Sequence, residues 1–136
     1  MLGDLNYRFN STYSEHIAHI KKSAFLTSSL DELCLERVQG RFPGYYEMPI
    51  EFEPTYKRDF KSNLTYINKK EQCPSYCDRV LVKQNCKQSK INFFKYASCD
   101  EVLGSDHRPV YLHYKVGLVF EHYMDPYRLM NPITPH

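Results

Sequence analysis

Two short blocks, Gly3–Arg8 and Ser105–Val110, constrain this chain more than any other feature of its sequence. They read Gly-Asp-Leu-Asn-Tyr-Arg and Ser-Asp-His-Arg-Pro-Val, and the blocks Pro54–Lys57 and Pro74–Arg79 lie between them. Together the four blocks supply three acids, one histidine and several cations, beside Gly, Pro and Ser residues that fix loops. These are the residue types that an attack on a phosphate ester requires.

Composition limits the classes of protein to which the chain can belong. Its 136 residues suffice for one domain with a core, and a net charge of +2 is too small for a general polyanion binder. Any phosphate binding must therefore come from locally placed Lys and Arg. No run approaches the roughly 20 apolar residues of a membrane span, and no signal peptide is visible. We expect a cytoplasmic protein, with peripheral contact at cytosolic membrane faces left open and an oligomeric state that the sequence does not define.

The five cysteines are an odd number without a secretory signal, which favours reduced thiols. A zinc site at Cys73 and Cys77 is the alternative, but their spacing lacks the second pair that structural zinc sites use. We interpret them as half-buried thiols beside a loop.

Helical signals are confined to residues 14–39. Ser14 could cap a first helix, and Ser29 with Glu32 forms a capping box before a second that should end near Gly40. Apolar residues share one face of that second helix, which predicts core packing: Leu30, Leu33, Cys34 and Val38.

The remaining chain reads as loops and strands. Met1–Arg8 resembles a strand end entering a loop, and residues 41–77 are rich in Pro, Gly and Asn and predict loop with short extended pieces. Three β-rich runs follow: Arg79–Lys83, Ile91–Tyr96 and Val110–Val119. We expect residues 121–136 to form a flexible tail or the start of a linker.

The first block places two polar side chains at alternate positions. If Asp4 and Asn6 lie in an extended segment, both point to the same side. A carboxylate that activates water and an amide that donates to a phosphoryl oxygen would then converge. Taken alone, Asp-x-Asn is also a common turn sequence.

The later blocks add a histidine, further acids and cations. His107 could donate to developing phosphoryl charge, and it needs a carboxylate that fixes its tautomer. Asp106 is adjacent, but neighbours on an extended backbone face apart, so Asp78 is the better partner in principle. Arg79 and Lys57 are candidate binders of additional phosphates, and the alternative for both is a solvated surface charge. For Asp106 and His107 the alternative is a simple pair at the surface.

In this order, Gly-Asp-Leu-Asn-Tyr-Arg, Pro-Thr-Tyr-Lys, Pro-Ser-Tyr-Cys-Asp-Arg and Ser-Asp-His-Arg-Pro-Val closely resemble the motifs of the inositol polyphosphate 5-phosphatases. The resemblance runs from Gly3 to about Phe120, and it implies the C-terminal portion, residues 1–120, of a two-sheet α/β sandwich of the endonuclease/exonuclease/phosphatase type. It also implies Mg²⁺-dependent removal of the 5-phosphate from phosphoinositides or soluble inositol polyphosphates, with no nucleic-acid partner.

The resemblance also implies roles for single residues. Asp4 would activate the attacking water, Asn6 would bind the scissile phosphate, and His107, oriented by Asp78, would stabilise the transferring group. Asp106 would lie near the magnesium ion or its waters. The neighbouring 4-phosphate of the inositol ring would be gripped by three residues: Tyr56, Lys57 and Arg79.

Two departures from the family pattern lead to further expectations. Tyr76 stands where the family usually has tryptophan, and another aromatic ring should still pack beneath the loop. The family's metal-binding glutamate and an active-site asparagine precede Gly-Asp-Leu-Asn, and this chain contains no such region, so we expect little activity from residues 1–136 alone. The alternatives are a non-catalytic phosphate-binding fragment and a nuclease of the same superfamily.

Overall fold

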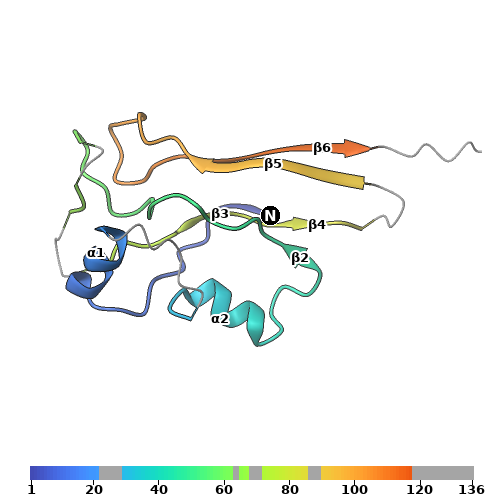
Figure 1. The fold of residues 1–136 in the computed structure, drawn as a ribbon, viewed down its shortest axis with the longest axis horizontal. Helices are drawn as coiled ribbons and strands as arrows, with labels where there is room; N and C mark the ends of the chain where they lie inside the picture. Colours follow the sequence, from blue (N-terminus) through green and yellow to red (C-terminus); the bar gives the residue numbers. More distant parts are fainter. Residues whose placement is uncertain (22–28, 63–64, 68–71, 86–89, 118–136) are drawn as a thin grey trace, which may run out of the picture.

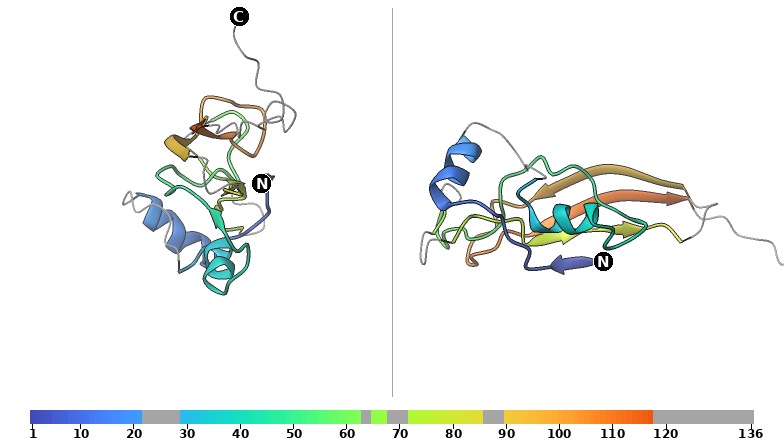
Figure 2. Two further views of the ribbon diagram at one scale, coloured as in Figure 1. Left: turned by 90° about the vertical axis from the view of Figure 1, so that its right-hand side faces the viewer. Right: turned by 90° about the horizontal axis from the view of Figure 1, so that it is seen from below.

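The computed structural model describes residues 1–21, 29–62, 65–67, 72–85 and 90–117. The elements follow one another as β1 (Leu2–Asp4), α1 (Tyr13–Lys21), α2 (Glu32–Val38), β2 (Tyr45–Tyr46), β3 (Asp78–Val80), β4 (Val82–Lys83), β5 (Lys90–Ser98) and β6 (Val110–Gly117). The long β5–β6 hairpin and the two helices lie on opposite sides of the short central strands (Figures 1 and 2).

Each strand pairs in an antiparallel two-stranded sheet: β1 with β3, β2 with β4 and β5 with β6. The β1–β3 pairing brings the start of the chain beside residues about 80 positions later, because Leu2 lies opposite Val80 and Asp4 opposite Asp78. The β5–β6 ladder shifts register between Phe93 and Lys95, where a bulge increases the local twist.

The three predicted β-rich runs are confirmed as strands. Residues 79–83 form β3 and β4, which are separated at the buried Leu81, and residues 91–96 lie within β5. The run that begins at Val110 forms β6 as far as Gly117, and the predicted tail, residues 121–136, lies outside the described residues. Of the segment 41–77, the described part is loop apart from the short strand β2, as expected.

Both helices form where the sequence predicts them, but their caps were misassigned. Ser14 lies inside α1, and Thr12 caps it: its Oγ1 accepts from the Glu15 amide at 3.4 Å, while Glu15 Oε2 accepts from the Thr12 amide at 3.1 Å. Asp31, not Ser29, is the N-cap of α2, because its side chain accepts from the Cys34 amide at 2.9 Å.

Fewer apolar residues of α2 are buried than its sequence pattern predicts. Leu33 is fully buried, but Val38 is 86% exposed and does not reach the core. The end of the helix agrees with expectation, because Gly40 adopts a φ of +88° and its amide donates to the carbonyl of Arg37.

Aromatic and aliphatic side chains from segments distant in sequence form the core, which contains Phe9, Ile50, Phe52, Tyr76 and Tyr96. Tyr76 is almost fully buried, and its ring lies 6.1 Å from that of Phe52 and 6.5 Å from that of Phe9. The expectation that Tyr76 packs beneath the loop is confirmed. This packing fixes the segment 74–77, which leads directly into the first residue of β3.

Candidate active site

The pairing of β1 with β3 brings two carboxylates together. Asp4 ends β1 and Asp78 begins β3, and the two are partners in the antiparallel register. Directly opposite residues of a strand pair project from the same face of the sheet. Asp4 is half exposed, with 49% of its side chain accessible, whereas the Asp78 side chain is mostly covered.

His107 lies between these carboxylates. Its Nδ1 is 2.9 Å from Asp78 Oδ2 and 3.2 Å from Asp78 Oδ1, and its Nε2 is 3.9 Å from Asp4 Oδ2. Asp78 also accepts a hydrogen bond from Thr55 Oγ1 at 2.7 Å. A carboxylate held by Thr55 and bonded to Nδ1 fixes the ring orientation and leaves Nε2 facing the exposed side of the site.

The turn after β1 sets the position of Asn6. Its backbone amide donates to Asp4 Oδ1 at 2.9 Å, and its φ of +60° lies in the left-handed region that Asn adopts more readily than most residues. Its side-chain oxygen accepts a hydrogen bond from Arg8 Nη2. Asn6 therefore lies in a tight turn after β1 rather than in a continuation of the strand, and its bond to Asp4 holds this turn next to the site.

Tyr56 forms a wall beside His107. The two residues form an isolated antiparallel bridge, and their ring centroids are 4.7 Å apart. The Tyr56 hydroxyl donates to Gln72 Oε1 at 3.1 Å, so the structure gives this hydroxyl a protein partner.

Lys57 and Asp106 lie together at the same end of the molecule. Lys57 Nζ is 3.6 Å from Asp106 Oδ2, and both side chains remain partly accessible. The predicted cation is thus present beside the Tyr56 ring, although its charge is paired with Asp106. An incoming phosphate could exchange for that carboxylate, because partly exposed ion pairs contribute little stability.

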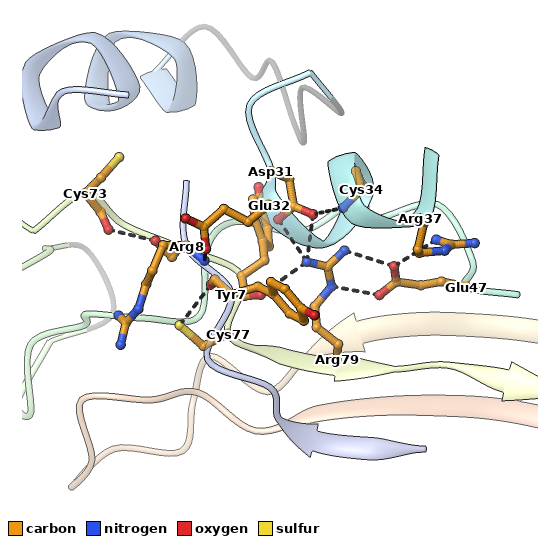
Figure 3. A network of polar contacts seen from close by, with 12 residues as sticks. Tyr7, Arg8, Asp31, Glu32, Cys34, Arg37, Glu47, Cys73, Cys77 and Arg79 are labelled. Carbon is orange, nitrogen blue, oxygen red and sulfur yellow. Dashed lines mark hydrogen bonds and ion pairs between the residues drawn. The ribbon is translucent and has the colours of Figure 1, made fainter. Parts of the chain in front are cut away.

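The position of Arg79 corrects the sequence-based expectation that it contacts substrate. Its side chain is 0% exposed and lies on the opposite side of β3 from Asp78, because successive residues of a strand point to opposite faces. The guanidinium contacts Asp31 at 2.9 Å and both carboxylate oxygens of Glu47, at 2.7 and 2.9 Å. Figure 3 shows these contacts beneath α2.

The raised pKa of Arg79 agrees with its place in this network of ion pairs. Burial by itself lowers the pKa of Arg79, but hydrogen bonds to Glu47 and the charges of Glu47 and Asp31 outweigh it, so the pKa is raised above its usual value. Arg79 therefore stays charged and paired inside the protein.

Two residues of the site were not predicted. Thr55 was part of a recognised block, but nothing in its sequence context indicated a bond to Asp78, which is 23 positions away. Arg8 closes another recognised block, and its guanidinium carbon lies 4.5 Å from the centroid of the Tyr56 ring. Its place inside the block was the one available signal.

Three of the described cysteines have a raised thiol pKa. Burial, the largest cause, raises the pKa of Cys34 and Cys73 to about 11 and that of Cys77 to about 12. Cys77 Sγ lies 3.5 Å from the carbonyl oxygen of Tyr7. Among the described residues, no group of three or more His, Cys, Asp or Glu side chains is arranged to hold a metal ion.

Comparison with known proteins agrees with this arrangement. A model of the Endonuclease/Exonuclease/phosphatase family 2 matches residues 1–113. The chain belongs to this family. Members of the family that resemble it include the zebrafish (Danio rerio) phosphatidylinositol 3,4,5-trisphosphate 5-phosphatase 2A, 33% identical over 125 residues that cover 85% of this chain and 10% of the relative.

Two plant members extend the same pattern. The type IV inositol polyphosphate 5-phosphatase 11 of Arabidopsis thaliana is 34% identical over 113 residues, or 80% of this chain and 34% of the relative. The type I inositol polyphosphate 5-phosphatase 2 of the same plant is 38% identical over 136 residues, or 88% and 19%. The chain therefore spans about a tenth to a third of the length of these relatives, and the resemblance to inositol polyphosphate 5-phosphatases is confirmed.

Solved structures of family-like folds confirm the fold class. The 5-phosphatase domain of SPsynaptojanin, solved with inositol (1,4)-bisphosphate and calcium, superposes with a TM-score of 0.71 at 33% identity, covering 83% of this chain and 32% of that one. The expected part of an α/β sandwich is thus observed. A Cimex nitrophorin in its ferrous nitric oxide complex superposes with a TM-score of 0.74 at 29% identity, covering 86% and 41%. Because one fold carries such different functions, the function of this chain has to be argued from the side chains of its site.

Proposed function

We propose that the protein removes the 5-phosphate from inositol polyphosphates or phosphoinositides. The observation that carries this proposal is the position of His107 between Asp78 and Asp4, with Nδ1 at 2.9 Å from Asp78 Oδ2 and Nε2 at 3.9 Å from Asp4 Oδ2. Phosphoryl transfer asks for positioned charges and donors rather than covalent chemistry from the protein, and this arrangement offers both.

The residues of the site divide the tasks of the proposed reaction among them. The half-exposed Asp4 carboxylate orients the attacking water and accepts its proton. The side-chain amide of Asn6 donates to an oxygen of the scissile phosphate. His107 Nε2 faces the developing phosphoryl charge, while Asp78 and Thr55 hold the ring in place.

Magnesium belongs to the proposal as well. Mg²⁺ binds through one or two carboxylates and otherwise through waters and substrate phosphates, so a closed set of three protein ligands is not required. The accessible oxygens of Asp4 and Asp106 fit this chemistry, and we assign Asp106 to the waters around the ion. When bound, the ion would neutralise phosphate charge and lower the pKa of a bound water.

Recognition of a neighbouring phosphate falls to Lys57. It lies next to Tyr56, which packs against His107, so a phosphate beside the scissile one would lie within its reach. Arg79 is excluded from this task by its burial, and Tyr56 contributes its ring more than its hydroxyl. The case for an inositol phosphate over a nucleic acid therefore depends on Lys57.

The proposal also covers the cell compartment of the protein and the activity of residues 1–136. Free cysteines at positions 34, 73, 77 and 99 support a reducing, cytoplasmic compartment. No helix in the described residues is long and apolar enough to cross a membrane. The assay below compares soluble and lipid substrates and so tests for peripheral contact with a membrane. Because the chain spans about a tenth to a third of its relatives, we propose that residues 1–136 alone bind substrate but turn it over slowly.

The test is phosphate release with Mg²⁺ by residues 1–136 and by any longer natural form of the protein. Substrates are inositol 1,4,5-trisphosphate and vesicles containing phosphatidylinositol 4,5-bisphosphate, with DNA containing abasic sites to test for nuclease activity. We expect release from the inositol phosphates and a loss of about 100-fold or more in His107→Ala. Arg41→Met, at an exposed position after α2, is the matched control.

Three outcomes would contradict the proposal in different ways. Cleavage of DNA without phosphate release would identify a nuclease. Binding of inositol phosphate without hydrolysis by every form tested would identify a regulatory binder. Undiminished turnover in His107→Ala would remove the assigned centre from the reaction.

A further inference from the structure

We propose that Arg8 is a positioning residue that sets which end of the Asn6 side-chain amide faces the substrate. The inference rests on the proposed function only in that Asn6 is taken to donate to a phosphate. The fixed orientation of the amide is a claim about the free protein and can be tested without any substrate.

Arg8 is anchored on two sides. Its backbone amide donates to Glu32 Oε2 at 2.8 Å, and its carbonyl accepts from the Glu32 amide at 3.1 Å, which ties the turn to the first residue of α2. Its side chain extends away from the network around Arg79 (Figure 3). It reaches the face of the Tyr56 ring, with the guanidinium carbon 4.5 Å from the ring centroid.

The two terminal nitrogens of Arg8 differ in their surroundings. Nη2 donates to the side-chain oxygen of Asn6. Nη1 is buried and has no hydrogen-bond partner among the described residues. Since this nitrogen is covered, it is not offered to a phosphate from solvent. The contact of the guanidinium with the site is therefore the bond from Nη2 to Asn6, and direct binding of a ligand by Nη2 is the competing outcome in the test below.

The chemistry of the two groups explains why this contact sets an orientation. An asparagine amide has an oxygen that only accepts and a nitrogen that only donates, and a half-turn of the side chain exchanges them at little steric cost. A phosphate requires the nitrogen. Because a guanidinium has donors and no acceptors, Arg8 can bind only the oxygen, which leaves the Nδ2 hydrogens pointing elsewhere.

The backbone of Asn6 does not set the orientation of its side-chain amide. Its amide is bound to Asp4 Oδ1 and its φ is +60°, so the main chain of the turn is fixed. The side chain still turns about its own bonds. Among the described contacts, the hydrogen bond from Arg8 is the one that distinguishes the oxygen of Asn6 from its nitrogen.

A double-mutant cycle tests the coupling between Arg8 and Asn6. The dissociation constant of residues 1–136 for inositol 1,4,5-trisphosphate is measured for wild type, Arg8→Met, Asn6→Ala and the double variant, with Arg41→Met as the control for a lost arginine charge. We expect each single variant to bind about tenfold more weakly and the double variant to bind no more weakly than Asn6→Ala. Additive losses would overturn the proposal, because Arg8 would then act independently of Asn6.

A second measurement separates this claim from the proposed function. Residual dipolar couplings of the Asn6 Nδ2–H bonds are recorded by NMR without ligand. We expect large couplings in wild type and couplings at least halved in Arg8→Met. Averaged couplings in wild type would refute the fixed amide, whereas large couplings together with no binding of the trisphosphate would refute only the proposed function.

A third variant covers the case in which Arg8→Met fails to fold. Arg8→Lys keeps the charge and offers donors without acceptors, so it should preserve the orientation of the amide and bind within about threefold of wild type. A folded Arg8→Lys protein with averaged Asn6 couplings would show that the donor-only chemistry of residue 8 is not what orients the amide.

Discussion

The two faces of β3 perform different tasks with residues that are neighbours in sequence. Asp78 faces the site, where it bonds to His107 and Thr55, and it remains partly accessible. Arg79 faces the helices, where its fully buried guanidinium joins Asp31 and Glu47. One face of the strand carries the chemistry and the other holds the fold together.

This difference shows how little adjacency in a motif says about shared function. Asp78 and Arg79 belong to one recognisable block, yet the alternation of side chains along β3 sends them to opposite faces of the strand. Arg79 is buried, which agrees with this division, and Cys77, the residue before β3, is buried as well. The predictions below test whether the two faces are as separate as they look.

The largest effect is expected on the buried face. Arg79→Met would remove the guanidinium that joins Asp31 to Glu47 and leave Glu47 with Arg37 at 3.4 Å, and breaking a buried ion pair in this way costs about 3–5 kcal/mol. Urea denaturation should show this loss in the free energy of unfolding. Arg41→Met removes an exposed arginine and should change it by about 0.5 kcal/mol or less. A similarly small change for Arg79→Met would mean that the buried network contributes no stability.

On the site face, the effect should appear in function and not in stability. Asp78→Asn keeps the shape of the side chain but removes the charge that orients His107, so phosphate release should fall by about 100-fold or more. The free energy of unfolding should change by about 1 kcal/mol or less, since Asn can still accept from Thr55. A loss of stability equal to that of Arg79→Met would break the comparison between the faces.

A smaller and more selective effect is expected from Lys57. Lys57→Gln removes the cation assigned to a neighbouring phosphate, so affinity for a substrate that carries the 4-phosphate should fall by about tenfold. Affinity for an analogue without that phosphate should stay within about twofold of wild type. Equal losses for both ligands would show that Lys57 senses charge in general and does not select the inositol 4-phosphate.

The smallest effect is a pH dependence of the free energy of unfolding that arises from a buried thiol. Burial raises the pKa of Cys77 from 9.0 to about 12 in the folded protein. The unfolded thiol ionises first as pH rises, so the stability that this thiol contributes is present below pH 9 and is lost between about pH 9 and 12. From pH 8 to about pH 9.7, the free energy of unfolding should fall by about 1 kcal/mol more in wild type than in Cys77→Ala. Equal decreases would show that the thiol is open to solvent.

Local patterns predicted much of the fold and of the site. The strands at 79–83, 91–96 and 110–117 follow from β-rich runs, and Asp78 with His107 follows from their blocks. The cap of α2 was misassigned because Ser29 and Asp31 are both good capping residues, and spacing alone does not choose between them.

Contacts between distant segments account for what the sequence did not reveal. Arg79 finds its acids 48 and 32 positions away, so nothing near it distinguished an internal ion pair from a phosphate contact. The opposition of Asp4 and Asp78 likewise depends on a strand register that only the assembled sheet defines.

Asp31 has one consequence for the way variants of this protein should be classified. Its carboxylate caps α2 and also binds Arg79, so a change there would remove a helix cap and a buried counter-ion together. A screen that scores only phosphate release would place Asp31 beside His107, as if both took part in the reaction. Measuring the amount of folded protein for each variant would separate inactive enzymes from absent ones, and Asp31 would move to the second group.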